Sequence, residues 1–255
     1  MSHAITRAVV AAGGAGTKMA PITRIIPKEM LPAGRMPILE HIVHELRTAG
    51  ITDVLFVISS HKPQIPAYFG SGTEYGMDFS YRVQDDGAGP GAPVLAAETW
   101  TAAQPFVLAF GDNLIRGGAD RETPLQRLVA GTSDCSVLTR VFPADGIPAH
   151  ETLLGAAAPP GPGSADVAFG RDLLDHVGAQ WVHACAARWV LGPFAFDALR
   201  ACPPRPGGEL YLIDAIRRWI AAGNELTALP LRPDDLRFNC DNWETYHDAV
   251  AALRP

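Results

Sequence analysis

The chain has 255 residues and a formal net charge of −6, with 27 acidic side chains against 21 lysines and arginines. This length suits one large α/β domain with a well-formed core, and the acidic balance implies no basic face for nucleic-acid binding. No apolar run reaches about eighteen residues and no cationic-then-apolar segment opens the chain, so we expect a cytoplasmic protein without a membrane span or secretory signal.

Apolar runs alternate with helical patterns through the first half of the chain. Strands are predicted at 8–12, 54–58, 79–83 and 106–110, and helices after Pro37 and over 92–102, with at best a short helix in the proline-interrupted segment 61–69. This alternation predicts right-handed βαβ units and a parallel sheet covered on both faces. Ligands of such sheets bind at the carboxyl ends of strands, where the Gly13–Gly16 turn and Gly111–Asp112 fall.

The second half of the chain is less regular. Strands are predicted at 135–142, 181–191, 226–231 and 236–240, and helices at 193–200, 209–222 and 242–253. Residues 155–166 are rich in glycine and proline, which predicts a loop. No internal repeat or interdomain linker is visible, so we expect a single domain over residues 1–255.

The four cysteines are widely spaced and form no C-x-x-C pair: Cys135, Cys185, Cys202 and Cys240. This usage argues against a zinc site or a disulfide framework. We therefore expect four small, buried side chains in a reducing compartment.

The segment 8–32 carries the strongest functional signal. An uncharged apolar run of strand length leads into a turn with three glycines, Gly13, Gly14 and Gly16. Glycines let the backbone turn tightly and let an anion approach the amide nitrogens. Three cations follow between stiffening prolines: Lys18, Arg24 and Lys28. This arrangement predicts a polyphosphate site, with an ordinary glycine-rich turn as the alternative.

The motif G-G-A-G-T-K-M-x-P, followed by P-K-E-M-L-P, resembles the signature of the sugar-1-phosphate nucleotidylyltransferases, most of all the bacterial UTP–glucose-1-phosphate uridylyltransferases. The resemblance implies a Rossmann-like α/β fold with a mostly parallel central sheet flanked by helices. It also implies a Mg²⁺-dependent reaction of a nucleoside triphosphate with a phosphorylated sugar-like acceptor. Residues 1 to about 130 would form the nucleotide-binding half and the remainder the acceptor-binding half. Many relatives form dimers or tetramers, but nothing in this sequence marks an interface.

For the phosphates, the resemblance implies that the turn binds through its backbone and that Lys28 contacts the reacting groups. The turn residues concerned are Ala12, Gly13, Gly14, Gly16 and Thr17. Lys18 stands where the family has an arginine. A point charge neutralises the leaving pyrophosphate but orients it less well than a bidentate guanidinium, so we expect a reduced rate without loss of binding.

For the base, Gln84 precedes Gly89 and Gly91 at the spacing of the family's pyrimidine-reading segment. The resemblance implies that Gln84 contacts uracil or thymine, because its amide offers the one donor and one acceptor that an imide edge needs. An exposed glutamine at a strand end is the alternative.

For a metal ion, Asp112 ends an apolar strand, where a carboxylate suits Mg²⁺ and a turn aspartate is the alternative. The family's second metal aspartate corresponds to Asn239, which offers a carbonyl oxygen without charge. Asp241 would point to the same face if the strand continued. It also fits the N-terminal cap of the last helix, and we favour the cap.

For the acceptor, G-G-E-L before a helix resembles the family motif whose glutamate accepts hydrogen bonds from sugar hydroxyls, here Glu209; a glutamate in the first turn of a helix is the alternative. The family's acceptor lysine has no counterpart, so Arg171 and Arg188 are the candidate cations. Ala187 stands where the family has a glycine close to the sugar. The nucleotide half therefore matches the family better than the acceptor half.

We expect a nucleotidylyltransferase that uses UTP or dTTP with a sugar 1-phosphate or a related polyol phosphate. Two alternatives stay open: a family member without turnover that binds nucleotides as a regulatory or partner subunit, and a cytidylyltransferase for a non-sugar phosphate. His41 and His44 on one helix, and the Asp85–Asp86 pair, are typical of solvated surface groups.

Overall fold

The computed structural model describes residues 4–84, 87–118, 122–149, 151–159, 167–171, 174 and 177–253, so the Asp85–Asp86 pair lies outside the described residues. Within this part of the chain, nine strands pair in one sheet: β1 Arg7–Ala12, β4 Asp53–Ser59, β5 Asp78–Gln84, β6 Phe106–Phe110, β8 Cys135–Pro143, β9 Leu153–Ala157, β10 Val167–Phe169, β11 Trp181–Leu191 and β12 Leu226–Pro230. The strand order is β10-β12-β8-β11-β6-β1-β4-β5, and β9 pairs with β11.

Most strands of this sheet run in the same direction. β1 pairs in parallel with β4 and β6, β4 with β5, and β8 with β12. β11 is antiparallel to β6, β8 and β9, and β10 is antiparallel to β12, so these two strands oppose the other seven of the described sheet. The predicted Rossmann-like α/β fold with a mostly parallel sheet is confirmed.

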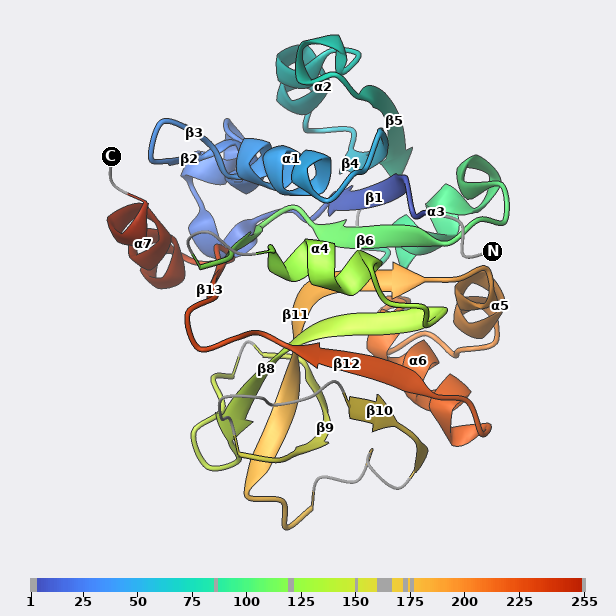
Figure 1. Ribbon diagram of the computed structural model, residues 1–255. Helices are drawn as coiled ribbons and strands as arrows, with labels where there is room; N and C mark the ends of the chain where they lie inside the picture. The colour runs from blue at the N-terminus through green and yellow to red at the C-terminus, as the bar shows by residue number, and fades with distance from the viewer. Residues whose placement is uncertain are drawn as a thin grey trace.

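Helices cover both faces of the sheet. They are α1 Ile38–Thr48, α2 Gln64–Phe69, α3 Ala92–Thr101, α4 Pro124–Val129, α5 Phe194–Arg200, α6 Leu212–Ala221 and α7 Trp243–Ala252. Buried side chains of α1, α2, α4 and α7 form one hydrophobic cluster, and those of α3, α5 and α6 form the other. Figure 1 shows how these helices are arranged around the sheet. Val9 of β1 faces one cluster and its neighbours Ala8 and Val10 face the other, as the alternation of side chains along a strand requires.

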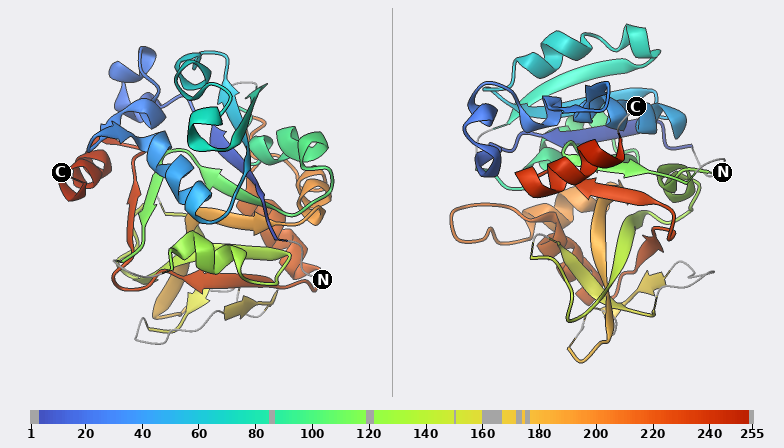
Figure 2. Two further views of the ribbon diagram at one scale, coloured as in Figure 1. Left: turned by 45° about the horizontal axis from the view of Figure 1, so that its top comes forward. Right: turned by 90° about the vertical axis from the view of Figure 1, so that its left-hand side faces the viewer.

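A separate pair of strands carries the C-terminal part of the chain back to the centre of the sheet. β7 (Asn113–Arg116) follows β6 and pairs antiparallel with β13 (Leu236–Asn239), with Asn113 opposite Asn239. The backbone N–H of Cys240 donates to the carbonyl of Asp112 at 2.7 Å. Residues 239–241 therefore lie against the carboxyl end of β6, and α7 packs beside β13 (Figure 2).

The elements expected from the sequence are present, with three corrections. The helix predicted to begin at Glu209 begins at Leu212, so Glu209 lies in the preceding loop. Residues 155–157, predicted as loop, belong to β9. Asn242, and not Asp241, caps α7, because its side chain accepts a hydrogen bond from the backbone N–H of Thr245. All four cysteines are buried.

Two short stretches of antiparallel structure complete the fold. β2 (Pro32–Ala33) and β3 (Met36–Pro37) form a small hairpin ahead of α1. The distal parts of β8 and β11 extend with β9 beyond the helices (Figure 1). No helix in the described ranges combines the length and the apolar character needed to cross a bilayer.

Candidate functional site

The glycine-rich turn lies at the carboxyl end of β1, between the ends of β4 and β6. Gly16 has a φ of +66°, which an L side chain rarely adopts, and the turn then passes into the 3₁₀ segment Thr17–Met19. Its carbonyl accepts a hydrogen bond from Oγ1 of Thr23 at 2.9 Å. Gly13, Gly14 and Ala15 line the cavity beneath the turn, whereas Ala12, Gly16 and Thr17 are absent from its lining in this conformation.

A buried ion pair holds the base of this turn. Nζ of Lys62 donates to the Ala12 carbonyl at 2.7 Å and to both carboxylate oxygens of Glu29 at 2.8 Å. The side chains of Lys62 and Glu29 are 6% and 2% exposed. Sequence reasoning missed this pair because its two residues are 33 positions apart and no motif joins them. A lysine at the start of a proline-interrupted helix was the only signal available.

The ammonium of Lys28 lies between two carboxylates. It is 2.5 Å from Oδ2 of Asp112 and 2.8 Å from Oδ1 of Asp241. Oδ2 of Asp241 in turn lies 2.5 Å from Nζ of Lys18, whose side chain is 58% exposed. The structure thus gathers both predicted lysines and two of the three predicted metal candidates into one cluster of alternating charges.

The charges of this cluster stabilise one another. Burial alone would lower the pKa of Lys28, but three surrounding carboxylates, led by that of Asp112, raise this pKa well above its ordinary value. Burial would raise the pKa of Asp112, but the Lys28 ammonium and the hydrogen bonds to the carboxylate lower it to about 2. Both groups are therefore charged at neutral pH.

Asn239 takes a different place from the one expected for a metal ligand. Its Oδ1 accepts a hydrogen bond from Nδ2 of Asn113 at 3.3 Å. Asp241, two residues on, has its carboxylate directed to Lys28 and Lys18 even though β13 ends at Asn239. The structure therefore places the Asp241 carboxylate, and not the Asn239 amide, with Asp112 around the Lys28 ammonium. Among the described residues, no cluster of three or more His, Cys, Asp and Glu side chains forms a metal site from protein groups alone.

The side chain of Gln84 packs against Gly13 of the turn and lines the same cavity. A Cβ atom added to Gly13 would come within 2.6 Å of Nε2 of Gln84. The Gln84 Oε1 atom is buried and has no hydrogen-bond partner. Because a buried amide oxygen without a donor is costly, this atom is a candidate acceptor for a ligand group.

The Gly89–Gly91 segment connects the two halves of the site. Gly91 donates its N–H to the Leu210 carbonyl at 2.8 Å, and Leu210 donates to the Ala88 carbonyl at 3.0 Å. A Cβ at Gly89 would meet the Leu210 carbonyl at 2.6 Å, so only glycine permits this approach. Gly89 lines the cavity and Gly91 does not. The contact places Glu209 across from the turn.

Two adjoining cavities form the cleft of the candidate site. The cavity under the turn measures about 310 Å³ and includes Gln84, Lys28 and Asp112. The second measures about 500 Å³ and shares five lining residues with the first: Gly14, Pro90, Phe110, Asp112 and Glu209. Asp112 and Glu209 therefore lie where the two cavities meet.

The larger cavity has a mixed apolar and polar wall. Trp189, Cys185 and Leu212 supply apolar surface, and Oε2 of Glu209 accepts a hydrogen bond from the Tyr211 hydroxyl at 2.9 Å. Ala187 also lines this cavity, with a φ of +59° that favours glycine, at the irregular stretch of β11 between Cys185 and Trp189.

The structure corrects the expectation for the acceptor-binding cations. The Arg188 side chain is fully buried and bonds to Glu45, 2.6 Å away, and to the Asn113 carbonyl. Arg171 donates to the Ala221 carbonyl at the end of α6. Neither arginine lines the larger cavity, whereas Arg237, which sequence reasoning did not consider, does. Its position on β13 three residues before Cys240 gave no recognisable signal.

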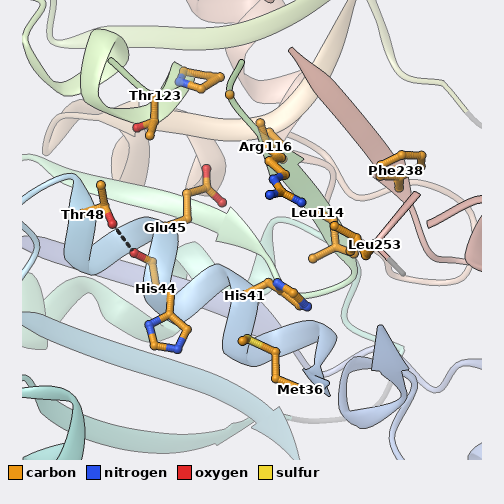
Figure 3. Close-up of a pocket in the computed structure, with 13 residues that line it drawn as sticks. Met36, His41, His44, Glu45, Thr48, Leu114, Arg116, Thr123, Phe238 and Leu253 are labelled. Atoms are coloured by element: carbon orange, nitrogen blue, oxygen red, sulfur yellow. Dashed lines mark hydrogen bonds between the residues drawn. The ribbon is translucent and has the colours of Figure 1, made fainter. Parts of the chain in front are cut away.

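A third cavity of about 460 Å³ lies on the other side of the β7–β13 pair (Figure 3). Glu45 of α1 points toward Arg116 of β7, whereas the ring of His44 points away from β7. Nε2 of His41 donates a hydrogen bond to the Ala33 carbonyl at 2.7 Å.

The fold and the cleft together define a Rossmann-like α/β protein with a glycine-rich turn and, beside it, an ion-paired cluster of two ammonium groups and two carboxylates. A family model described as nucleotidyl transferase matches residues 7–145, more than half of the chain, and the protein belongs to that family. The predicted relationship to nucleotidyltransferases is confirmed.

Relatives with named activities match most of the chain. It is 29% identical over 234 residues to a glucose-1-phosphate thymidylyltransferase of Streptomyces antibioticus, a match that covers 88% of this chain and 60% of that protein. It is 26% identical over 243 residues to the UTP–glucose-1-phosphate uridylyltransferase of Streptococcus pneumoniae serotype 4, covering 85% and 80% of the two chains. The chain thus spans about three fifths of the length of the thymidylyltransferase.

Solved structures share the fold over nearly the whole chain. A UDP-glucose pyrophosphorylase complexed with UDP-glucose superposes with a TM-score of 0.81 at 24% identity, covering 97% of this chain and 98% of the other. A UTP-bound UGPase from Acinetobacter baumannii gives 0.78 at 21% identity, covering 97% and 93%. At identities of 21% and 24%, these structural similarities show that the fold is shared, and no more than that.

Proposed function

We propose that this protein is a nucleotidylyltransferase that couples UTP or dTTP to a sugar 1-phosphate or a related polyol phosphate. The observation that carries the proposal is the meeting of Lys28, Asp112 and Asp241 at the edge of the glycine-turn cavity, where a triphosphate has both cations and amide donors within reach. Membership of the nucleotidyl transferase family and the names of the relatives support it. We place the reaction in the cytoplasm.

The chemistry asks the protein for positioning and charge neutralisation. An oxygen of the acceptor phosphate attacks the α-phosphorus, a new P–O bond forms, and the bond from the α-phosphorus to the bridging oxygen breaks. Pyrophosphate leaves with that electron pair. Lys28 is buried, protonated and fixed, so it suits the reacting phosphates, while the exposed Lys18 suits the departing pyrophosphate.

The donor set fits a hard divalent cation, which we propose is Mg²⁺. Asp112 and Asp241 converge closely enough to share one ammonium, and carboxylate oxygens are the ligands that Mg²⁺ prefers. When bound, such an ion neutralises charge on the phosphates. We assign Asn239 an indirect role at this cation site, through the hydrogen bond that its amide oxygen accepts from Asn113.

Of the remaining site residues, we assign Gln84 to the base of the nucleotide and Glu209 to the acceptor. Gln84 has an unsatisfied amide oxygen beside the turn, which suits the N–H of a uracil or thymine imide. Glu209 lies at the junction of the two cavities and accepts hydroxyl donors, as its bond from Tyr211 illustrates. We assign residues 1 to about 130 to the nucleotide half and the rest to the acceptor half, with the Glu209 loop closing onto the nucleotide half through Gly91.

A pyrophosphate-release assay tests the proposal. The folded protein is given Mg²⁺, each of UTP, dTTP, CTP, ATP and GTP, and a panel of sugar 1-phosphates and polyol phosphates. Turnover with UTP or dTTP and at least one of these acceptors supports the proposal. Preference for CTP with a non-sugar phosphate would instead show a cytidylyltransferase.

One observation favours a second candidate, a nucleotide-binding protein without turnover. Among the described residues lining the larger cavity, the single cation is Arg237, and it is already paired with Glu151. An acceptor phosphate therefore meets no unpaired cation there. Calorimetric binding of UTP without pyrophosphate release on any acceptor, even in the Asn239→Asp variant, would support this candidate and exclude the enzyme.

A further inference from the structure

Asn113 lies at the centre of a chain of polar contacts that ends on Asp112. Its side chain is buried, with the residue 5% exposed. Nδ2 donates to Oδ1 of Asp112 at 2.8 Å and, at 3.3 Å, to Asn239. On the other side, Oδ1 of Asn113 accepts a hydrogen bond from Nη2 of Arg237 at 2.9 Å. One amide thus joins a carboxylate of the candidate site to a guanidinium in the cavity wall.

Arg237 is anchored independently of Asn113. Its Nη1 lies 2.5 Å from Oε1 of Glu151, and the two side chains are 5% and 4% exposed. A buried Arg–carboxylate pair of this kind is held in place, because either charge left alone would be strongly unfavourable. The position of the Nη2 donor beside Asn113 is therefore fixed by Glu151.

This anchor determines which way the Asn113 amide faces. A guanidinium only donates hydrogen bonds, so the group of Asn113 that contacts Arg237 must be its oxygen. The NH₂ group must then face Asp112, whose ionised carboxylate only accepts. A reversed amide would place oxygen against carboxylate and NH₂ against guanidinium, which is unfavourable at both ends.

The two oxygens of Asp112 consequently have different partners. Oδ1 receives the Asn113 amide and Oδ2 receives the Lys28 ammonium. Rotation of the carboxylate away from this orientation would break at least one of these two hydrogen bonds. Glu151 immediately precedes Thr152, which lines the larger cavity, so the same contacts link the acceptor side of the cleft to Asp112.

We propose that Asn113 and Arg237 are positioning residues that orient the Asp112 carboxylate for a divalent cation and the reacting phosphates, with Arg237 acting through Asn113. The inference rests on the proposed function for the role of Asp112. It gives Asn113 a positioning role. It also explains why a buried arginine lines the acceptor cavity, without requiring that this arginine contact the substrate.

The alternative role for Arg237 is direct contact with the acceptor phosphate. Its Nε is buried and has no hydrogen-bond partner. If this N–H bound an oxygen of the acceptor phosphate, Arg237 would be an acceptor ligand, and its replacement would change the acceptor KM without changing the affinity for a metal–nucleotide complex. The test below separates the two.

The test compares Asn113→Ala, Arg237→Gln and the double variant with the wild-type protein. Mn²⁺ affinity in the presence of UTP and the absence of acceptor is measured by electron paramagnetic resonance, and kcat and acceptor KM by pyrophosphate release. We expect each single variant to weaken Mn²⁺ binding about 10-fold, the range for partners of metal ligands, with little change in acceptor KM. The double variant should lose no more than Asn113→Ala alone, because Arg237 acts through Asn113.

Two further variants keep the test decisive. Arg237→Lys retains one donor for Asn113 and should recover part of the Mn²⁺ affinity lost in Arg237→Gln. If Arg237→Gln fails to fold because Glu151 loses its ion pair with Arg237, the paired Arg237→Gln and Glu151→Gln replacement removes both charges and should show the same 10-fold loss.

Three results would overturn the inference. The first is a loss of Mn²⁺ affinity in the double variant that equals the product of the losses in the two single variants. The second is a raised acceptor KM with unchanged Mn²⁺ affinity in Arg237→Gln. The third is a wild-type protein that binds no Mn²⁺ in the presence of UTP. A wild-type protein that binds Mn²⁺ and UTP but turns over no acceptor would remove the proposed enzymatic activity alone. In that case the binding comparison among the variants still decides the positioning role.

Discussion

The Lys28 ammonium lies 2.8 Å from the carboxylate of Asp241, although the two residues are 213 positions apart in the sequence. The β7–β13 pair produces this contact, because it aligns Asn113 with Asn239 and sets the following turn against the end of β6. The cation-rich loop after β1 and the turn after β13 thereby meet at one point. The proposed site depends on this meeting more than on either segment alone.

The first prediction follows from the position of Asp241. Replacing it with asparagine removes one of the two carboxylates that surround Lys28, so we expect kcat to fall on the order of 100-fold, comparable to the loss of one charge-stabilising group in other active sites. Asn239→Ala is the matched control, since its amide oxygen receives a single long hydrogen bond, and it should lose less than about 10-fold. Steady-state pyrophosphate release measures both. A larger loss in Asn239→Ala would assign the metal role to residue 239.

The second prediction concerns Gly13 and Gln84. Gly13→Ala places a Cβ within 2.6 Å of the Gln84 amide, and this flexible side chain can move away, so the fold should keep its thermal stability. The displaced amide no longer reaches the base, and we expect the Kd for UTP to rise about 10-fold, the value of one buried hydrogen bond. Calorimetric titration with UTP measures the change.

The control for this prediction is a double-mutant cycle. Gln84→Ala should weaken UTP binding by a similar factor, and adding Gly13→Ala to it should cost little more, because the group that clashes is already gone. Additive losses would mean that Gly13 acts on the phosphates through its own backbone, and that Gln84 does not contact the base.

The sequence was sufficient for the turn and the sheet because both are local patterns. The apolar run before Gly13, and the glycines and lysines that follow it, are contiguous, and the alternation of strands and helices fixed the fold class. The acceptor side could not be predicted in this way. Arg188 and Arg237 are both arginines on strands, and only the packing of Glu45 and Glu151 decides which of them lines the cavity.

The preferred interpretation of Asp241 as the N-terminal cap of α7 was wrong for a related reason. A carboxylate just before a helix is a common cap, so the local pattern favoured that role. The adjacent Asn242 supplies the cap instead, which leaves Asp241 free to face Lys28 across a contact that no sequence pattern records. Long-range ion pairs of this kind, like that of Lys62 with Glu29, depend on topology and not on neighbouring residues.

The third prediction tests the buried pair beneath the turn. Lys62→Met leaves the buried Glu29 without its hydrogen-bonded counter-charge, and we expect the free energy of unfolding to fall by about 3–5 kcal/mol. The double replacement with Glu29→Gln removes both charges and should recover most of this loss. Urea denaturation at pH 7 measures all three proteins. Equal losses in the single and double variants would show that packing, and not charge, is what Lys62 supplies.

We also expect the double variant, Lys62→Met with Glu29→Gln, to bind UTP more weakly. The Ala12 carbonyl loses its donor at the base of the turn, so the amide groups that face the cavity are held less firmly. We expect the Kd for UTP to rise by about 5- to 10-fold even where the protein is fully folded, consistent with the loss of one hydrogen bond to a charged group. An unchanged Kd would show that the turn keeps its shape without Lys62.

The fourth prediction concerns pH and the buried His183, which is 2% exposed and bonds through Nδ1 to the Thr139 hydroxyl at 2.9 Å. Burial lowers the pKa of His183 to about 4 from an ordinary 6.5. Since the unfolded chain takes up this proton more readily, the contribution of the neutral imidazole to stability is complete above pH 6.5. It declines as the pH falls from 6.5 to 4, by about 3 kcal/mol in total.

Chemical denaturation at a series of pH values measures this effect by comparison with His183→Gln. Carboxylates titrate in both proteins, so the relevant quantity is the difference between their free energies of unfolding. We expect this difference to be constant above about pH 7, and to shift by about 3 kcal/mol in favour of the variant between pH 6.5 and 4. A difference that does not depend on pH would mean that His183 is protonated in the fold as readily as in the unfolded chain.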